Sequence, residues 1–177
     1  MTDLLMRRAA EISPCGLYRY WLEREWDTAL PKLVICMLNP STADAAVDDP
    51  TLLTLIHFGR LWGYGGLAVV NLYAWRSPHP SVMKSAAARL DDVNLRRGRE
   101  AMLVAATMGD RRLLVAWGND GDFEGQATRF ADCAADLIGV DLICLGTTLS
   151  GAPKHPMARG RSRIPRDQQP IIWRKAK

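Results

Sequence analysis

The sequence lacks several features that assign a chain to a well-known class. Four of its 177 residues are cysteines, and no two of them form a C-x-x-C pair, so their spacing does not support a zinc site. Neither a G-x-x-x-x-G-K-[ST] phosphate loop nor a G-x-G-x-x-G fingerprint is present. No apolar run approaches the roughly 20 residues that span a bilayer. The N-terminal MTDLLMRRAAEISP carries charges instead of the long apolar core of a signal peptide. We therefore expect a cytoplasmic protein with no membrane segment, no metal and no cofactor.

The composition is typical of one folded domain. Hydrophobic residues make up 48% and charged residues 24% of the chain, a balance that excludes a disordered polypeptide. A chain of this length can bury one substantial core. Cys36 and Cys144 lie inside apolar runs, so we interpret them as small buried hydrophobic side chains. We expect a single domain over residues 1–177.

The net charge of +4 is unevenly distributed. Residues 154–177 contain eight Lys or Arg and one Asp, whereas residues 1–153 contain fifteen basic and eighteen acidic residues. A basic segment of this kind can contact a phosphate backbone or remain a solvated tail. We treat residues 157–177 as a basic C-terminal segment that is peripheral to the domain, and both interpretations of its charge stay open.

Apolar runs alternate with helical patterns along the chain. Short runs at residues 33–38, 67–72, 113–117 and 141–145 are typical of buried parallel strands. A helix is expected to start at Pro50, with Asp49 as its N-cap, and to end near Gly63. Further helices are expected over residues 90–108 and 123–137, and the aromatic stretch 18–26 is expected to add an edge strand. The alternation predicts an α/β three-layer sandwich around a mostly parallel sheet of about four to five strands.

Polar residues follow each predicted strand. In open α/β sheets, ligands bind beyond the carboxyl ends of the strands. The four loops supply Asn39, Pro40, Ser41, Thr42 and Asp44, then Asn71 and Tyr73, then Trp117 and Asn119, and finally Thr147, Ser150, Lys154 and His155. Each loop alone has the composition of an ordinary turn, but four together favour a cleft at one edge of the sheet.

Several motifs are similar to those of one family. They are MLNPSTAD at residues 37–44, DPT at 49–51, WGYG at 62–65, VNL at 70–72 and KHP at 154–156. Together they resemble the bacterial family called domain of unknown function 1643, over about residues 18–155. This resemblance implies no activity.

The order of the motifs also resembles, more distantly, the uracil-DNA glycosylase superfamily and its mismatch-specific members. Those enzymes carry a Gly-hydrophobic-Asn-Pro loop after the first strand, which is similar to residues 37–40, with Met37 in the place of the Gly. The resemblance implies a glycosylase-like fold in which Asn39 positions the attacking water. It also implies that Asn71 reads a base and that His155 contacts the base or the DNA.

The chemistry of these side chains suits a nucleobase ligand. Hydrolysis of an N-glycosidic bond needs a positioned water and stabilisation of the departing base. Asn39 and His155 are the candidate catalytic residues, and an Asn amide such as Asn71 offers a donor and an acceptor to a base edge.

Tyr73, Trp75 and Trp117 are candidates to stack on a base, and the alternative for Trp75 and Trp117 is packing in the core. The remaining loop residues would bind the substrate. We predict recognition of DNA or a nucleotide and leave open whether the site is catalytic and which oligomeric state the protein adopts.

Two other classes of function stay open. Oxygen ligands from five loop aspartates suit Mg²⁺ and a phosphoesterase or nuclease reaction; the five are Asp44, Asp48, Asp49, Asp120 and Asp122. The alternative for these residues is that Asp49 caps a helix and the others solvate loops. A non-catalytic module that binds nucleic acid or a nucleotide would use Ser41 and Thr42, near a helix start, to hold phosphate. We interpret His57 as structural and His79 as part of an exposed turn.

Overall fold

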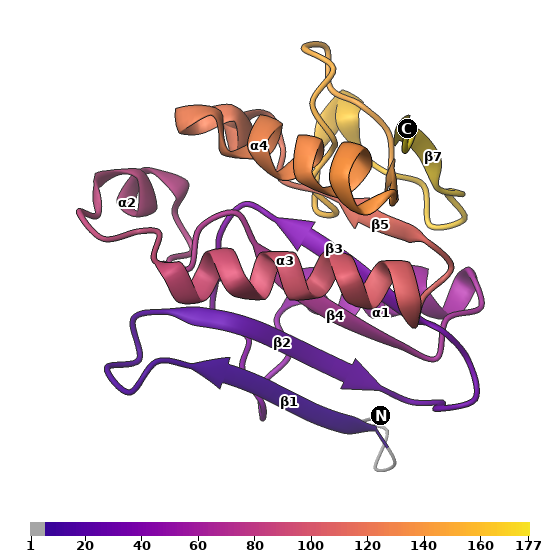
Figure 1. The fold of residues 1–177 in the computed structure, drawn as a ribbon, viewed down its shortest axis with the longest axis horizontal. Coiled ribbons are helices and arrows are strands. Elements are labelled where there is room, and N and C mark those ends of the chain that lie inside the picture. Colours follow the sequence, from indigo (N-terminus) through magenta and orange to yellow (C-terminus); the bar gives the residue numbers. More distant parts are fainter. Residues whose placement is uncertain (1–5) are drawn as a thin grey trace.

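A mixed seven-stranded sheet forms the centre of the molecule. The structure is a computed structural model, and it describes residues 6–177. The strands lie in the order β1-β2-β4-β3-β5-β6-β7 (Figure 1). Their bounds are β1 Arg7–Ile12, β2 Arg19–Glu25, β3 Lys32–Met37, β4 Gly66–Asn71, β5 Arg112–Val115, β6 Asp141–Cys144 and β7 Ile171–Arg174. The four central strands β4, β3, β5 and β6 run parallel, while β2 and β7 run antiparallel to their neighbours.

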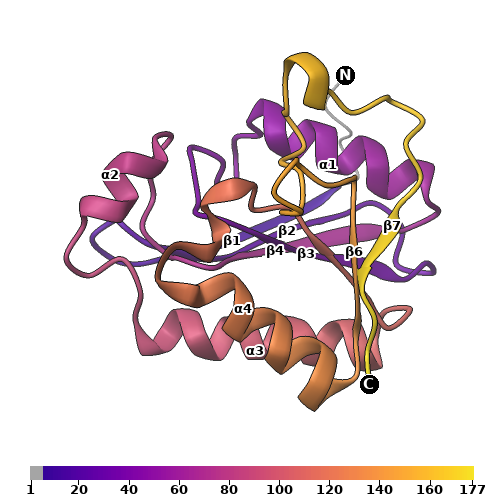
Figure 2. The same cartoon turned by 90° about the horizontal axis from the view of Figure 1, so that it is seen from above.

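Helices cover both faces of this sheet. Figure 2 shows α1 on one face and α3 with α4 on the other. The helices are α1 Pro50–Leu61, α2 Pro80–Ser85, α3 Asp92–Thr107 and α4 Gln126–Asp132, which continues as a π-helical turn over Cys133–Ile138. The predicted α/β class and the order of its central elements are thus confirmed. Within residues 6–177, no helix combines the length and apolarity needed to cross a membrane.

Both faces of β3 are buried, which explains its unbroken apolar sequence. Cys36 packs with Met102 in the cluster beneath α3 and α4, whereas its neighbour Ile35 packs with Leu55 in the cluster beneath α1. Because successive side chains of a strand point to opposite faces, a strand covered on both sides has no polar positions. The two cores therefore lie on either side of one sheet, and the predicted burial of Cys36 and Cys144 is confirmed.

The start of α1 follows from its sequence. The Asp49 carboxylate accepts a hydrogen bond from the backbone N–H of Leu52 at 2.8 Å, and Pro50 occupies the first helical position. An N-cap side chain satisfies a donor that the helix itself leaves unpaired. This confirms the predicted cap, and it places the loop after β3 directly against the N-terminus of α1.

Three parts of the predicted architecture were wrong. The sheet has seven strands, not four to five. The predicted edge strand β2 lies inside the sheet, because β1 pairs with its outer side. The short helix α2 was not predicted. The added strands β1 and β7 read RRAAEI and IIWR, and as half-exposed edge strands they lack the continuous apolar run of a central strand.

The basic C-terminal segment contributes directly to the sheet. Its strand β7 pairs antiparallel with β6. Arg174 forms ion pairs with Asp132 and Asp136 at 2.7 and 2.9 Å. Arg174, one of the basic residues counted in this segment, is thus a structural partner of α4 and of the turn that follows it.

Candidate functional site

A small cavity lies at the carboxyl ends of β3 and β4, and we call it the strand-end cavity. Its volume is about 50 Å³. The polar side chains around it belong to Arg19, Asn39, Ser41, Asp49, Thr51, Asn71 and His155, and the apolar ones include Met37, Leu22 and Leu55. Of the predicted site residues, the structure thus brings together Asn39 and Ser41 from the loop after β3, Asn71 from the end of β4 and His155 from the segment after β6.

The loop after β4 holds the amide of Asn39 in one orientation. Its Nδ2 donates to the carbonyl oxygens of Ser77 at 2.8 Å, Pro40 at 3.1 Å and Trp75 at 3.4 Å. An amide nitrogen carries only two protons, so these acceptors occupy its donor side fully. The Oδ1 atom is left as the acceptor that Asn39 can present to a ligand or a water.

Asn71 and Arg19 contact each other at the bottom of the cavity. The Asn71 side chain is buried, and its Oδ1 accepts a hydrogen bond from Arg19 Nη2 at 3.3 Å. Arg19 Nη1 donates to the carbonyl oxygen of Ala43 at 2.9 Å. Two buried nitrogens, Arg19 Nε and Asn71 Nδ2, have no hydrogen-bond partner among residues 6–177. Buried donors of this kind are rare in folded proteins.

A β-bulge aims Arg19 into the cavity. The pairing of β1 with β2 shifts register between Glu11 and Ile12, which leaves Tyr20 as an extra residue on β2. In a regular strand Arg19 and Leu22, three positions apart, would point to opposite faces. The bulge changes this alternation, and both side chains line the same cavity.

Arg19 is a buried cation without a carboxylate in contact. Only 5% of its surface is exposed, and no acidic side chain of the described chain forms an ion pair with it within 4 Å. Burial lowers the pKa of Arg19 to about 10, and the more distant carboxylate of Asp49 opposes this effect. The guanidinium therefore remains charged at neutral pH.

His155 presents a neutral ring to the cavity. Its Nδ1 accepts a hydrogen bond from the backbone N–H of Met157 at 3.1 Å, so the proton of the neutral ring is assigned to Nε2. Burial lowers the pKa of His155, and the carboxylate of Asp49 partly opposes the shift. At pH 7 the ring is therefore a neutral donor through Nε2–H.

The loop aspartates are engaged in separate structural contacts. Asp44 Oδ1 accepts from two backbone N–H groups at 2.8 Å each, and these bonds lower the pKa of Asp44. Asp48 pairs with Arg24, Asp120 pairs with Lys84, and Asp122 accepts from the Thr128 hydroxyl. In the part of the chain that the structure describes, no three His, Cys, Asp or Glu side chains are grouped so as to hold a metal ion.

Two predicted aromatic residues lie in the core and not at the cavity. Tyr73 is fully buried, and its hydroxyl donates to the carbonyl oxygen of Phe123 at 2.5 Å. Burial raises the pKa of Tyr73 to about 12. Trp117 is 3% exposed and packs edge-on against Phe130 and Trp173. The position of Trp117 matches its alternative of core packing, whereas the burial of Tyr73 was not predicted.

Other predicted residues form a second polar cluster on the loops after β5 and β6. Asn119 Oδ1 accepts from the hydroxyls of Thr148 at 2.7 Å and Ser150 at 3.0 Å. Thr147 is exposed and forms a bridge with Pro153. This cluster is separate from the strand-end cavity. Pro40, Thr42, Asp44 and Lys154 likewise do not line that cavity.

His57 and His79 lie where the sequence interpretation expects them, in a structural contact and in an exposed turn. His57 Nε2 contacts the carbonyl oxygen of Arg166 at 2.7 Å, which ties α1 to the C-terminal segment. His79 is exposed and precedes α2. Neither lines the strand-end cavity.

Sequence reasoning missed Arg19 as a site residue. The sequence interpretation placed Arg19 only within an expected strand. An arginine within the aromatic run YRYW could have indicated a site, because Arg is seldom fully buried without a partner. Asp49 was assigned only to the helix cap or to a metal site. Its Oδ1 does cap α1, and its carboxylate also lines the cavity.

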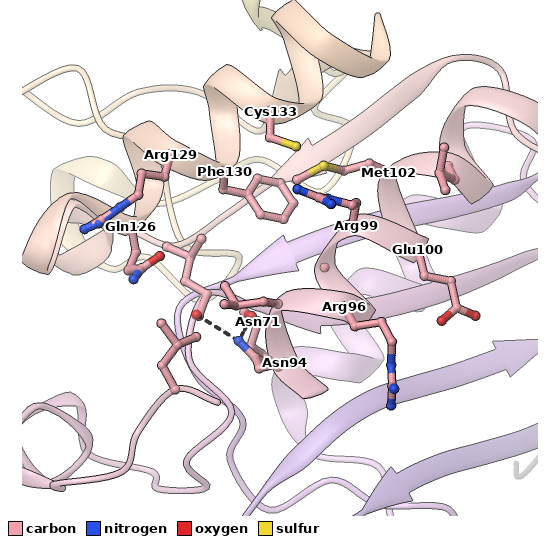
Figure 3. Close-up of a pocket in the computed structure, with 15 residues that line it drawn as sticks. Asn71, Asn94, Arg96, Arg99, Glu100, Met102, Gln126, Arg129, Phe130 and Cys133 are labelled. Carbon is pink, nitrogen blue, oxygen red and sulfur yellow. Dashed lines mark hydrogen bonds between the residues drawn. The ribbon is translucent and has the colours of Figure 1, made fainter. Parts of the chain in front are cut away.

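A larger groove lies between α3 and α4, with a volume of about 790 Å³ (Figure 3). Leu90, Met102 and Phe130 supply apolar surface. Asn94 Nδ2 donates to the carbonyl oxygens of Asn71 and Leu72 at 3.2 and 3.0 Å, which joins α3 to the end of β4. Asn71 is the one predicted site residue that lines this groove.

A comparison with protein families assigns the chain to one family. The sequence model of the family described as "Protein of unknown function (DUF1643)" matches residues 19–157. The chain belongs to this family. In this DUF1643 chain the match extends from Arg19 to two residues beyond His155, so it includes every residue that lines the strand-end cavity. No curated protein and no solved structure matches the chain. The relation to uracil-DNA glycosylases stays a prediction.

Proposed function

We propose that the strand-end cavity recognises a nucleobase-sugar unit, in DNA or in a nucleotide, and that it hydrolyses the N-glycosidic bond within a glycosylase-like architecture. The observation that carries the proposal is the convergence of Asn39, Asn71 and His155 on one cavity. These residues follow different strands, and the carboxyl ends of parallel strands are where open α/β sheets bind ligands.

Asn39 would orient the attacking water. Its amide nitrogen is held by three backbone carbonyls, so Oδ1 is fixed as an acceptor for one proton of that water. An amide is too weak a base to deprotonate water, so the role is one of positioning. A fixed acceptor of this kind favours one direction of attack on the sugar.

His155 would stabilise the departing base. Because Nδ1 already accepts from Met157, the ring donates through Nε2. The lowered pKa keeps it neutral near pH 7, and a neutral donor can hydrogen-bond to negative charge that develops on a leaving base. Asn71 would add a second donor through Nδ2, which has no partner among residues 6–177.

The size of the cavity limits what enters it. At about 50 Å³ it is smaller than the roughly 300–1,000 Å³ of most ligand pockets. Met37 lines the cavity at the position where the resembling glycosylases carry Gly. We infer that only one edge of a base enters, while sugar and phosphate remain outside. The exposed Arg159, Arg161 and Arg163 follow His155 in the chain and would contact phosphate.

The test is a strand-cleavage assay on duplex and single-stranded oligonucleotides that carry uracil, thymine mismatches, hypoxanthine or oxidised pyrimidines. We expect abasic sites in the presence of EDTA and a rate about 100-fold lower in Asn39→Ala. Asn119→Ala is the matched control, because Asn119 is an exposed loop asparagine outside the cavity. His155→Gln provides a second variant that leaves the bonds of Asn39 intact.

Two outcomes would replace the proposal by its alternatives. Cleavage that requires Mg²⁺ and stops in EDTA would favour a phosphoesterase. Salt-sensitive DNA binding without turnover, unchanged in Asn39→Ala, would favour a non-catalytic module, since phosphate contacts release counterions.

A further inference from the structure

The bottom of the strand-end cavity holds a cation that the fold does not neutralise. Arg19 is buried and charged, and its Nε–H has no acceptor among residues 6–177. Taking a charge out of water is costly unless it is paired and hydrogen-bonded. A bulge in β2 nevertheless directs this side chain inward. We therefore attribute the buried position of Arg19 to a ligand group that binds in the cavity.

Three unused hydrogen-bond donors lie at the cavity, which is also lined by the acceptor Oδ1 of Asn39 and by the carboxylate of Asp49 that caps α1. Arg19 Nε and Asn71 Nδ2 are unpartnered donors, and the free ring nitrogen of His155 is also a donor. One lone pair of Asn71 Oδ1 already accepts from Arg19 Nη2, whereas its Nδ2 has no partner. Three donors, one of them charged, are complementary to an acceptor atom that carries negative charge.

The position of these donors is fixed before any ligand arrives. Arg19 is held through both terminal nitrogens, by the carbonyl oxygen of Ala43 and by Asn71. A buried guanidinium held in this way needs little reorganisation when it meets a charge, which is the condition for effective electrostatic stabilisation. The small volume of the cavity restricts the bound group to one oxygen-bearing substituent.

We propose that Arg19 and Asn71 form a receptor for an oxygen atom that carries negative charge. Two kinds of ligand supply such an oxygen atom: a phosphate group, and a departing nucleobase through its exocyclic oxygen. The second source rests on the proposed function. As the bond from the sugar carbon to the base nitrogen breaks, its electron pair leaves with the base and spreads to the exocyclic oxygen. The water oxygen bonds to the sugar carbon, and one water proton is released to solvent.

The first test observes the two donors directly by nuclear magnetic resonance of ¹⁵N-labelled full-length protein. Inorganic phosphate and free uracil are the two probes. We expect at least one probe to shift the Arg19 Nε–H and Asn71 Nδ2 signals. The Arg24 Nε–H signal is the internal control, because that group already donates to Asp48 at 2.8 Å, and it should not move.

The second test uses variants that lack the receptor and are expected to remain folded. Asn71→Asp keeps the size of the side chain and gives Arg19 a carboxylate partner, so we expect a folded protein that binds the shifting probe about tenfold or more weakly. Arg19→Met removes the charge and should cause the same loss. Thermal unfolding of each variant confirms that it is folded.

The outcomes separate this proposal from the proposed function. A response to phosphate alone supports the receptor with a phosphate ligand, and a response to uracil alone supports it with a base. Silence of both donor signals with both probes overturns it, as does undiminished binding in folded Arg19→Met and Asn71→Asp. Glycosylase activity that persists at full rate in Arg19→Met overturns the role in base departure and leaves the proposed function intact. Phosphate binding without any glycosylase activity supports the receptor and contradicts the proposed function.

Discussion

The two ends of β2 each bury an arginine, and the two arginines have opposite surroundings. At one end Arg24 has no exposed side-chain surface, and it contacts Asp48 through Nε at 2.8 Å and Nη2 at 2.7 Å. It also donates to the backbone carbonyl oxygens of Glu23 and Asp44. At the other end Arg19 has a neutral amide and one carbonyl as acceptors, and its Nε has none.

The difference separates a structural cation from a functional candidate. Arg24 ties the loop after β3 to β2, because its acceptors come from both segments. Every polar group it needs is supplied by the protein. Arg19 is equally inaccessible but incompletely satisfied, so burial alone does not identify a site. What distinguishes Arg19 is that its unpaired Nε belongs to a residue that lines a polar cavity, whereas Arg76, whose Nε is also unpartnered, does not line that cavity.

The largest effect that would test this contrast is expected for Arg24→Met. The substitution leaves Asp48 and several loop carbonyls without their donor, so we expect the free energy of unfolding to fall by about 3–5 kcal/mol. Urea denaturation followed by circular dichroism measures it. A loss below about 1 kcal/mol would show that the remaining ion pair of Asp48, with the half-buried Arg8 at 3.0 Å, suffices.

The free energy of unfolding should also depend on pH through His155, which lines the cavity at the Arg19 end of β2. Its folded-state pKa is lowered from 6.5 by burial, so the unfolded chain binds more protons. The free energy of unfolding should therefore decrease as the pH falls below about 6.5. Unfolding curves between pH 7.5 and 5.5 measure it. His155→Gln should flatten the profile, whereas His79→Gln, at an exposed position, should leave it unchanged.

A substitution away from both ends of β2 gives a reference value for the changes in the free energy of unfolding. Gly98 lies inside α3, and a Cβ atom there would meet Phe130 Cε2 at 3.7 Å, an ordinary contact. Gly98→Ala should therefore raise the free energy of unfolding by about 0.5–1 kcal/mol through helix propensity. The same urea curves measure it, and a decrease would indicate that the α3–α4 interface does not tolerate the added methyl group.

The smallest change in stability is expected for Arg19→Met. The substitution removes a buried charge that has no carboxylate partner, and it also loses two hydrogen bonds, so we expect the free energy of unfolding to change by less than about 1 kcal/mol in either direction. Comparison with Arg24→Met under identical conditions is the measurement. An equally large loss in both variants would remove the distinction between the two arginines.

Several elements were predictable because their signals are local. The strands β3 to β6 carry apolar runs that only a doubly covered sheet requires, and α1 begins at an Asp-Pro cap whose geometry involves neighbouring residues alone. The candidate residues Asn39, Asn71 and His155 were also predictable, because parallel strands bring their carboxyl ends to one edge. The predicted convergence of these three on one cavity agrees with the structure.

Long-range contacts determined the rest. The pairing of β1 with β2 and of β7 with β6 joins segments whose residue patterns do not indicate central strands. Whether Tyr73 and Trp117 face a ligand or the core depends on which helices cover them. Two of the loop aspartates pair with distant residues, since Arg24 lies 24 positions from Asp48 and Lys84 lies 36 positions from Asp120.

Arg19 shows most directly where the sequence reaches its limit. Residue types and spacing place it on a strand, and regular alternation would assign its side chain to the face opposite Leu22. A bulge, which exists only because β1 pairs with β2 in a shifted register, turns it into the cavity. Local chemistry thus established the central elements and most of the polar loop residues. The register between two distant strands established which cation lies at the bottom of the site, because the direction of a side chain depends on how the sheet is assembled.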